Sequence, residues 1–164
     1  MATLTVTHSE SLVLDGRDRS ATSTFSITNI DNIYERTLSV ANTATTIALF
    51  RDEESGADGA IDIQEAKYIR ITNTDTADIL ILAFDIDQDE DDGDAGEAFN
   101  ISVSPGQSFV FGSPHDSANA NDSDVGGESI GIDAALHDIR KIIGKNGTDS
   151  TNLKVEIYIA GTEA

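Results

Sequence analysis

The chain has 164 residues, enough for one domain with a substantial hydrophobic core, and it contains no cysteine, which excludes disulfides, thiolate chemistry and a cysteine-ligated zinc site. Ten Lys and Arg against 30 Asp and Glu give a formal net charge of −20, so the surface repels nucleic-acid phosphates and anionic membranes. This acidity also suits a chain that works in salty water, where ions screen the self-repulsion, and a marine or halophilic source is therefore a hypothesis.

The beginning of the chain has neither the basic segment nor the apolar segment of a signal peptide. The longest apolar run, residues 79–84, is far shorter than the roughly 20 residues that span a bilayer as a helix. We therefore expect a protein made in a cytoplasm, with no signal peptide, no transmembrane segment and no membrane partner.

Apolar residues alternate with polar ones along most of the chain, and this period of two predicts β-strands. The alternating sets, in chain order, are Leu4 and Val6; Phe25 and Ile27; Tyr34, Leu38 and Val40; Ile47 and Leu49; Ile69 and Ile71; Phe99, Ile101 and Val103; Phe109 and Phe111; and Leu153, Val155, Ile157 and Ile159. Residues 79–82 are apolar at every position, which predicts a central strand covered on both faces.

Turn signals separate these strands. Pro105-Gly106 fits the two central positions of a type II turn, and Asn146-Gly147 marks a turn before the last strand. About ten short strands spaced some 8 to 15 residues apart predict an antiparallel β-sandwich that resembles a jelly roll. We expect one all-β domain over residues 1–164, with at most one short helix.

The segment 132–143 allows two interpretations. Its apolar residues partly fit a helical period of 3.6. The alternative is a short helix or turn up to His137 followed by a strand over 139–143. We favour the second interpretation, because that strand would then pair with the final strand.

Two polar segments interrupt the pattern, at residues 85–97 and 113–131, and are predicted to be surface insertions. The first contains eight carboxylates in thirteen residues, and clustered Asp oxygens are the ligands that calcium prefers. The candidate ligands are Asp85, Asp87, Asp89 and Asp91. The spacing fails the EF-hand loop, however, since Glu90 stands where that loop needs glycine, so a solvated acidic loop is favoured and no cofactor is assigned.

Residues 127–131 match the G-x-S-x-G sequence of a hydrolase nucleophile, which would make Ser129 the candidate. The motif requires a strand before the serine and a helix after it, together with a downstream acid and histidine, and the all-β pattern contradicts that arrangement. The histidines His8, His115 and His137 are far apart and form no metal-binding pair. We therefore expect no enzyme and no catalytic residue.

Three segments together carry a resemblance. They are the strand KYIRITNTD over residues 67–75 with the two-sided apolar strand after it, the turn and strand PGQSF over 105–109, and the closing strand ending IYIAG at 157–161. Together they resemble small virion structural proteins of tailed viruses. The resemblance covers most of the chain and implies a β-sandwich that decorates or cements a capsid, or is associated with the tail or its fibres, usually as an oligomer. The acidic insertion 85–97 is not part of that pattern.

The leading prediction is a non-enzymatic virion protein, most simply a capsid decoration or cement protein that contacts the major capsid protein, other virion proteins and copies of itself. A homo-oligomer, with a trimer as one option, follows from the same resemblance. The first alternative is a calcium-dependent module that binds carbohydrate or a receptor, and the second is a tail or fibre component. A hydrolase using Ser129 is the remaining class.

Overall fold

The computed structural model describes residues 1–50, 66–86, 97–112, 139–148 and 151–162. Every regular element in these residues is an antiparallel β-strand, which confirms the all-β prediction. Within the same residues, no helix has the length and hydropathy needed to cross a membrane.

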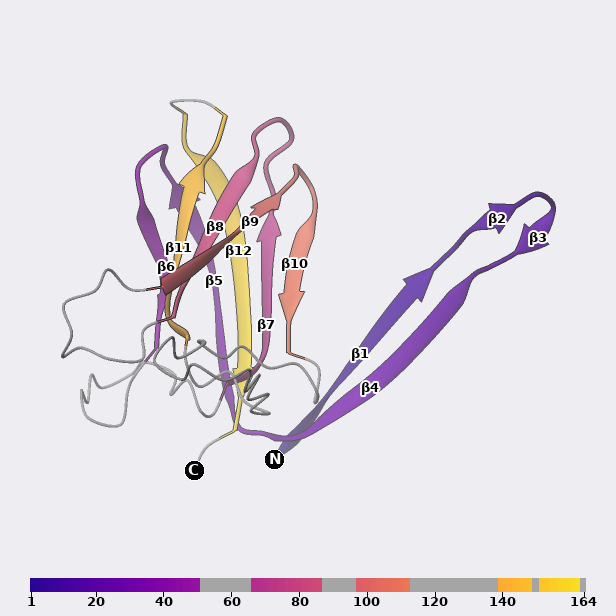
Figure 1. Cartoon of the computed structure of the whole chain (residues 1–164). Coiled ribbons are helices and arrows are strands. Elements are labelled where there is room, and N and C mark those ends of the chain that lie inside the picture. The colour runs from indigo at the N-terminus through magenta and orange to yellow at the C-terminus, as the bar shows by residue number, and fades with distance from the viewer. Residues whose placement is uncertain (51–65, 87–96, 113–138, 149–150, 163–164) are drawn as a thin grey trace, which may run out of the picture.

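The described residues form twelve strands, where about ten were predicted for the whole chain. Their bounds are β1 Ala2–Glu10, β2 Val13–Leu14, β3 Arg17–Asp18, β4 Ala21–Ile30, β5 Asn32–Val40, β6 Thr45–Leu49, β7 Ala66–Asn73, β8 Leu80–Ile86, β9 Glu97–Val103, β10 Ser108–Phe111, β11 Ile139–Asn146 and β12 Leu153–Gly161. The first four strands form a hairpin arm, and the remaining eight form a sandwich (Figure 1).

The sandwich consists of two four-stranded sheets. One has the strand order β10-β7-β12-β5, and the other has the order β6-β11-β8-β9. We call them the β5 sheet and the β6 sheet. The pairs are nested in the sequence: β8 pairs with β9, β7 with β10, β6 with β11 and β5 with β12. The chain therefore behaves as one long antiparallel ribbon folded across two sheets.

The hydrophobic core lies between the two sheets and is formed by one parity of each strand, as the alternation predicts. Phe84 is fully buried, with its ring centroid 4.7 Å from that of Phe99 and 5.3 Å from that of Phe109. Strand β8 lies inside its sheet, between β11 and β9, as expected for a central strand. The expectation that residues 79–82 are covered on both faces is wrong at Ile79, which precedes β8 and is 40% exposed.

Three connections between strands are held together at one end of the sandwich by two buried asparagines. The amide nitrogen of Asn73 donates to the backbone carbonyls of Asp78 and Val103, at 2.8 and 3.0 Å. The amide nitrogen of Asn146 donates to a carboxylate oxygen of Asp78 and to the carbonyl of Thr151, both at 2.8 Å. Polar groups that are buried here are therefore paired, as burial requires.

The strand predicted over 139–143 is present as β11, but its predicted pairing with the final strand is wrong. Strand β11 pairs with β6 and β8, whereas β12 pairs with β5 and β7 in the opposite sheet. A short connection can join neighbouring strands or carry the chain across the core, and period-two alternation is the same in both cases. Residues 132–137, where the short helix or turn was predicted, lie outside the described residues.

The turn at Pro105-Gly106 has the predicted geometry, with Gly106 at φ +70° and the Gln107 amide donating to the Ser104 carbonyl at 3.0 Å. It also crosses between sheets, because β9 and β10 lie in different ones. The predicted insertion at 85–97 is shorter than expected, since β8 continues to Ile86 and β9 begins at Glu97. The second insertion, 113–131, lies outside the described residues.

Candidate functional site: the projecting hairpin arm

The arm is a two-stranded antiparallel ribbon made by the first thirty residues. Strands β1 and β4 pair from Leu4 opposite Ile27 to Glu10 opposite Ala21, and β2 pairs with β3 beyond them. The turn is formed by Asp15 at φ +50° and Gly16 at φ +72°. Two consecutive residues with positive φ define a type I′ turn, whose twist matches that of the flanking strands. The ribbon therefore continues to its end without a break in register.

One face of the arm consists of hydroxyl side chains. Cross-strand pairs of hydroxyl oxygens lie 3.4 Å apart at Thr5 and Ser26, 3.2 Å apart at Thr7 and Thr24, and 3.1 Å apart at Ser9 and Thr22. We call this the hydroxyl face. Small side chains of one kind give a flat ribbon surface that a neighbouring backbone can approach closely.

The opposite face of the arm changes character along its length. Near the body it carries the apolar residues Leu4, Val6, Phe25 and Ile27, which belong to one packed cluster. Towards the far end the same parity brings Leu12 and Leu14 opposite Arg19 and Arg17. We call these four residues the tip face. The arm therefore presents apolar surface at both ends of one face, and only the inner end is covered.

The inner end, or root, of the arm is anchored on the outer face of the β5 sheet. Ile27 and Ile30 are buried there against Tyr68 and Ala160, and Tyr158 packs at the margin. Burial raises the pKa of Tyr68 above its ordinary value of 10.0. The N-terminal ammonium also lies 3.5 Å from the Asp31 carboxylate, where the arm joins β5. The root is thus fixed to the body, and it sets the direction in which the arm leaves.

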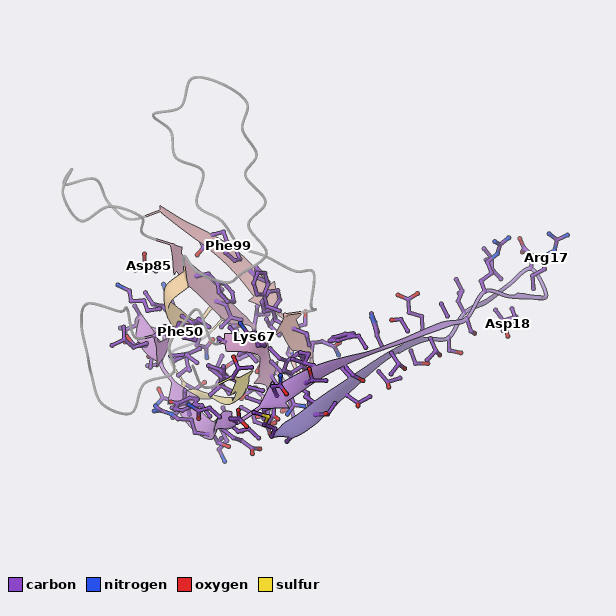
Figure 2. The ribbon with its side chains drawn as sticks, turned by 90° about the horizontal axis from the view of Figure 1, so that it is seen from below. Arg17, Asp18, Phe50, Lys67, Asp85 and Phe99 are labelled. Carbon is purple, nitrogen blue, oxygen red and sulfur yellow. The ribbon has the colours of Figure 1, made fainter. Side chains whose placement is uncertain are left out.

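Beyond the root the arm contacts no other described part of the chain. Every residue from 7 to 24 is exposed, and the arm diverges from the sandwich (Figures 1 and 2). Figure 2 shows Arg17 and Asp18 at its far end, remote from the sandwich residues Phe50 and Phe99. At a rise of about 3.3 Å per residue, residues 7–14 extend the free part by roughly 25 Å.

The end of the arm carries an uncovered apolar group. Leu12 is 50% exposed, Val13 69% and Leu14 51%. Because consecutive strand residues point to opposite faces, Leu12 and Leu14 form a small apolar patch on the tip face, whereas Val13 lies on the opposite face with Asp18. An isolated two-stranded hairpin is also only marginally stable in water. Both properties are typical of a segment that is covered in an assembly.

The arm carries almost none of the acidic excess of the chain. Residues 1–30 contain three acids, Glu10, Asp15 and Asp18, and two arginines, which leaves 27 acids and eight bases in residues 31–164. The side-chain charges are therefore −1 for the arm and −19 for the rest of the chain. At the tip, a hydrogen bond from the Ser20 side chain and a second from its backbone amide lower the pKa of Asp18. The Asp18 carboxylate is thus hydrogen-bonded to Ser20. The Asp18 side chain lies on the opposite face of the ribbon from Arg17 and Arg19.

Of the four predicted calcium ligands, the described residues include Asp85. Its carboxylate lies 2.7 Å from the ammonium nitrogen of Lys141, on the outer face of the β6 sheet. Asp87, Asp89 and Asp91 lie outside the described residues. In the part of the chain that the structure describes, no three His, Asp or Glu side chains are grouped as a metal ion would require. The structure therefore assigns Asp85 to an ion pair with lysine.

The other residues singled out from the sequence are widely separated. His8 lies on the free part of the arm, on the same parity as the tip face. His115, His137 and Ser129 lie outside the described residues.

Sequence reasoning identified the strands around Leu4 and Phe25 but missed that they form an arm. Two signals for it are present. Asp15-Gly16 between short apolar and polar runs is a strong hairpin signal, and the first thirty residues hold almost none of the acidic excess. Neither signal shows how the hairpin sits on the body, because that depends on Tyr68 and Ala160, which are far away in the sequence.

Comparison with known proteins gives no match for this chain among protein-family models, curated proteins or solved structures.

Proposed function

We propose that this chain is a non-enzymatic structural protein of a virion, and that it decorates or cements the capsid by contacts with the shell and with copies of itself. The observation that carries the proposal is the projecting arm with its uncovered tip. A ribbon of eighteen consecutive exposed residues, with two leucines uncovered on one face of its far end, is typical of a segment that a partner protein covers in an assembly.

The order of the strands supports a role in a virion. Eight strands divide into sheets of order β10-β7-β12-β5 and β6-β11-β8-β9, with nested pairs. We propose that this arrangement is a jelly roll, the double-sheet architecture found among viral capsid domains and also among lectins and cupins. A jelly roll by itself does not define a function, because one fold serves many functions. The arm adds an independent reason to choose assembly.

The distribution of charge supports a role in which the molecule stays separate until it is assembled. A chain with a formal net charge of −20 repels other copies, and does so over longer distances in dilute salt, which keeps free molecules soluble. Assembly on a repeating shell then adds many individually weak contacts, and their combined avidity offsets this repulsion. Salt screens the repulsion within about 8–10 Å at physiological ionic strength, so assembly is expected to be salt-dependent.

Co-sedimentation with the cognate shell tests the proposal. Purified chain is mixed with shells that lack it, over a range of salt concentrations, and the bound fraction is measured. We expect saturable binding at a fixed ratio of chain to shell subunits. If the chain stays in the supernatant at every salt concentration, the proposal is wrong.

A shortened variant tests the role assigned to the arm. Residues 7–24 are replaced by Asn-Gly, which closes a two-residue turn between the paired residues Val6 and Phe25. The root keeps its contacts with Tyr68, so the body is expected to keep its melting temperature. Weaker shell binding by this variant would support the proposal, whereas unchanged binding would remove the arm from it.

A further inference from the structure

We propose that Asn146-Gly147 is a latent modification site, which the closed sandwich protects and which deamidates when this end of the sandwich opens. The modification converts the side-chain amide of Asn146 to a carboxylate, as aspartate or as isoaspartate. The product no longer fits its surroundings, so a molecule that has reacted closes less well. This behaviour does not depend on the proposed function, because it concerns the integrity of the fold and involves no partner.

An asparagine followed by glycine is prone to deamidation, and residues 146–147 are the one such pair in the sequence. The backbone nitrogen of Gly147 attacks the side-chain carbon Cγ of Asn146, and the new N–Cγ bond closes a succinimide ring. The bond from Cγ to Nδ2 breaks, and Nδ2 leaves as ammonia with the proton from the Gly147 nitrogen. Water then opens the ring at one of its C–N bonds and leaves a free carboxylate. Glycine favours the attack because it has no Cβ to obstruct the nitrogen or to restrict the backbone.

Both nitrogens that take part in this reaction are held by hydrogen bonds in the folded chain. The Gly147 nitrogen, which is the nucleophile, donates to the Ile79 carbonyl at 2.9 Å. The leaving nitrogen, Nδ2 of Asn146, donates to a carboxylate oxygen of Asp78 and to the Thr151 carbonyl, both at 2.8 Å. These hydrogen bonds join three connections between strands, so they must break together before the ring can close.

Burial and packing close the site further. Asn146 is 2% exposed, and its side-chain oxygen accepts a hydrogen bond from the Thr148 amide at 2.8 Å. A Cβ added to Gly147 would lie 2.8 Å from Cδ1 of Ile81, so a side chain of β8 covers the backbone here. The asparagine amide cannot turn without losing hydrogen bonds that solvent is not present to replace. The folded state therefore suppresses deamidation, and the rate is set by how often this end of the sandwich opens.

The product does not fit the place of the asparagine. Nδ2 of Asn146 lies 2.8 Å from the Asp78 carboxylate, so an aspartate there brings two carboxylates together at an enclosed position. The Thr151 carbonyl loses its donor at the same time. Isoaspartate also adds a carbon atom to the backbone at the last residue of β11. Deamidation is therefore an irreversible record that this end of the sandwich has opened.

Deamidation of the natural chain in its folded and denatured states tests the protection. Samples with and without urea are incubated in the same mildly alkaline buffer, and peptide mass spectrometry follows the gain of about 1 Da at Asn146. We expect the folded chain to react at least about a hundredfold more slowly, because only its open fraction is reactive. Equal rates in the two samples, or no reaction in urea, would overturn the inference.

Two controls separate the chemistry of the dipeptide from the fold. Asn73 is also buried, but it is followed by threonine, so in urea it should react more slowly than Asn146 in the same molecules. Gly147→Ala should slow the reaction of Asn146 in urea, where the close approach of the added methyl group to Ile81 has no effect. If Asn73 reacts as fast as Asn146 in urea, or if Gly147→Ala changes nothing there, the inference is wrong.

Substitution of Asp78 tests whether the hydrogen bonds at this end control the rate. Asp78→Ala removes an acceptor of Asn146 Nδ2, and we expect it to speed deamidation of the folded chain by about tenfold or more. Asp78→Asn keeps an oxygen that can accept and should have a smaller effect. Val13→Ala, in the exposed part of the arm, should leave the rate unchanged. An unchanged rate in Asp78→Ala, or an equal increase in Val13→Ala, would contradict protection by these contacts.

Asn146→Asp reproduces one product directly and tests its effect on the fold. Asn100→Asp is the matched control, because it changes the net charge equally at an exposed position on β9. At neutral pH we expect the melting temperature to fall by about 5 °C or more for Asn146→Asp and by less than about 2 °C for Asn100→Asp. A chain with Asn146→Asp that is too unstable to give a folded baseline would support the same conclusion. Equal melting temperatures for the two variants would show that the product fits, and would overturn the inference.

Discussion

The sandwich and the arm are made of similar strands, but they are held in place by different forces. In the sandwich, Val155, Ile157 and Ile159 of β12 are buried in a core shared by two sheets. In the arm, β1 has the same alternation, yet from Thr7 onwards every residue is exposed. The body is stabilised by burial, whereas the free arm has only backbone pairing and a row of hydroxyl contacts.

Alternation therefore predicts a strand without predicting what covers it. The stability of the body should be cooperative, since its strands share one core, and the arm should open locally at a much lower free energy. Similar substitutions are therefore expected to lower the free energy of global unfolding in the sandwich but not in the free arm.

Phe84→Ala should have the largest effect. Phe84 is fully buried and contacts the rings of Phe99 and Phe109, so its removal leaves a cavity in the shared core. We expect the free energy of unfolding to fall by about 3–5 kcal/mol, measured by denaturant titration. Val13→Ala in the arm is the control and should change it by less than about 0.5 kcal/mol. Comparable losses would show that the arm folds as part of the body.

Asn73→Ala should have the next largest effect. The Asn73 side chain is fully buried, and without it the carbonyls of Asp78 and Val103 lose a donor. Unpaired buried carbonyls should lower the free energy of unfolding by about 1–3 kcal/mol. Asn100→Ala is the matched control, because Asn100 is exposed on β9. If Asn73→Ala and Asn100→Ala have equally small effects, the hydrogen bonds of the Asn73 side chain do not stabilise this end of the sandwich.

Gly16→Ala and Gly106→Ala form a matched pair. Both glycines have a left-handed φ, +72° and +70°, and an added Cβ would contact nothing within 4 Å at either position. At both positions the cost of the substitution should therefore come from backbone strain alone, because alanine disfavours a left-handed φ by about 1–2 kcal/mol. We expect Gly106→Ala to lower the free energy of global unfolding by that amount. Gly16→Ala should leave it unchanged and instead speed hydrogen exchange of the arm amides. Equal changes in global unfolding would contradict the separation of the two regions.

Much of the sandwich could be predicted from the sequence, because its alternation reports burial directly. The strands around Ile69, Phe99 and Ile157 are present, and the turn at Gly106 has the predicted geometry. The partner of β11 could not be predicted, since alternation is the same whether a chain turns back or crosses the core. The arm was missed for a related reason: Leu4 and Phe25 pack on Tyr68, and nothing in local sequence encodes that contact. Of the predicted calcium ligands, Asp85 proves to be paired with Lys141, a partner 56 residues away.

The smallest expected effect is a difference in pH dependence between Asp75 and Asp18. The backbone amides of Ala77 and Asp78 donate to the Asp75 carboxylate at 2.8 and 3.0 Å and lower its pKa below the ordinary value of 3.8. A depressed pKa adds stability that is present above the unfolded pKa and is lost as the pH falls through the folded pKa. The difference in stability between the natural chain and Asp75→Asn should thus be constant above about pH 5 and shrink below about pH 4.

Asp18 is the matched control in the arm, where hydrogen bonds from Ser20 also lower the carboxyl pKa. Because the arm is expected to open without unfolding the body, Asp18→Asn should leave the pH dependence of global unfolding unchanged. Denaturant titrations from pH 3 to 7 on both variants and the natural chain measure the two differences. The same low-pH loss for Asp18→Asn would show that the arm unfolds together with the sandwich. A loss for Asp75→Asn alone would place the boundary between two independently opening regions within this chain, where the arm leaves its root.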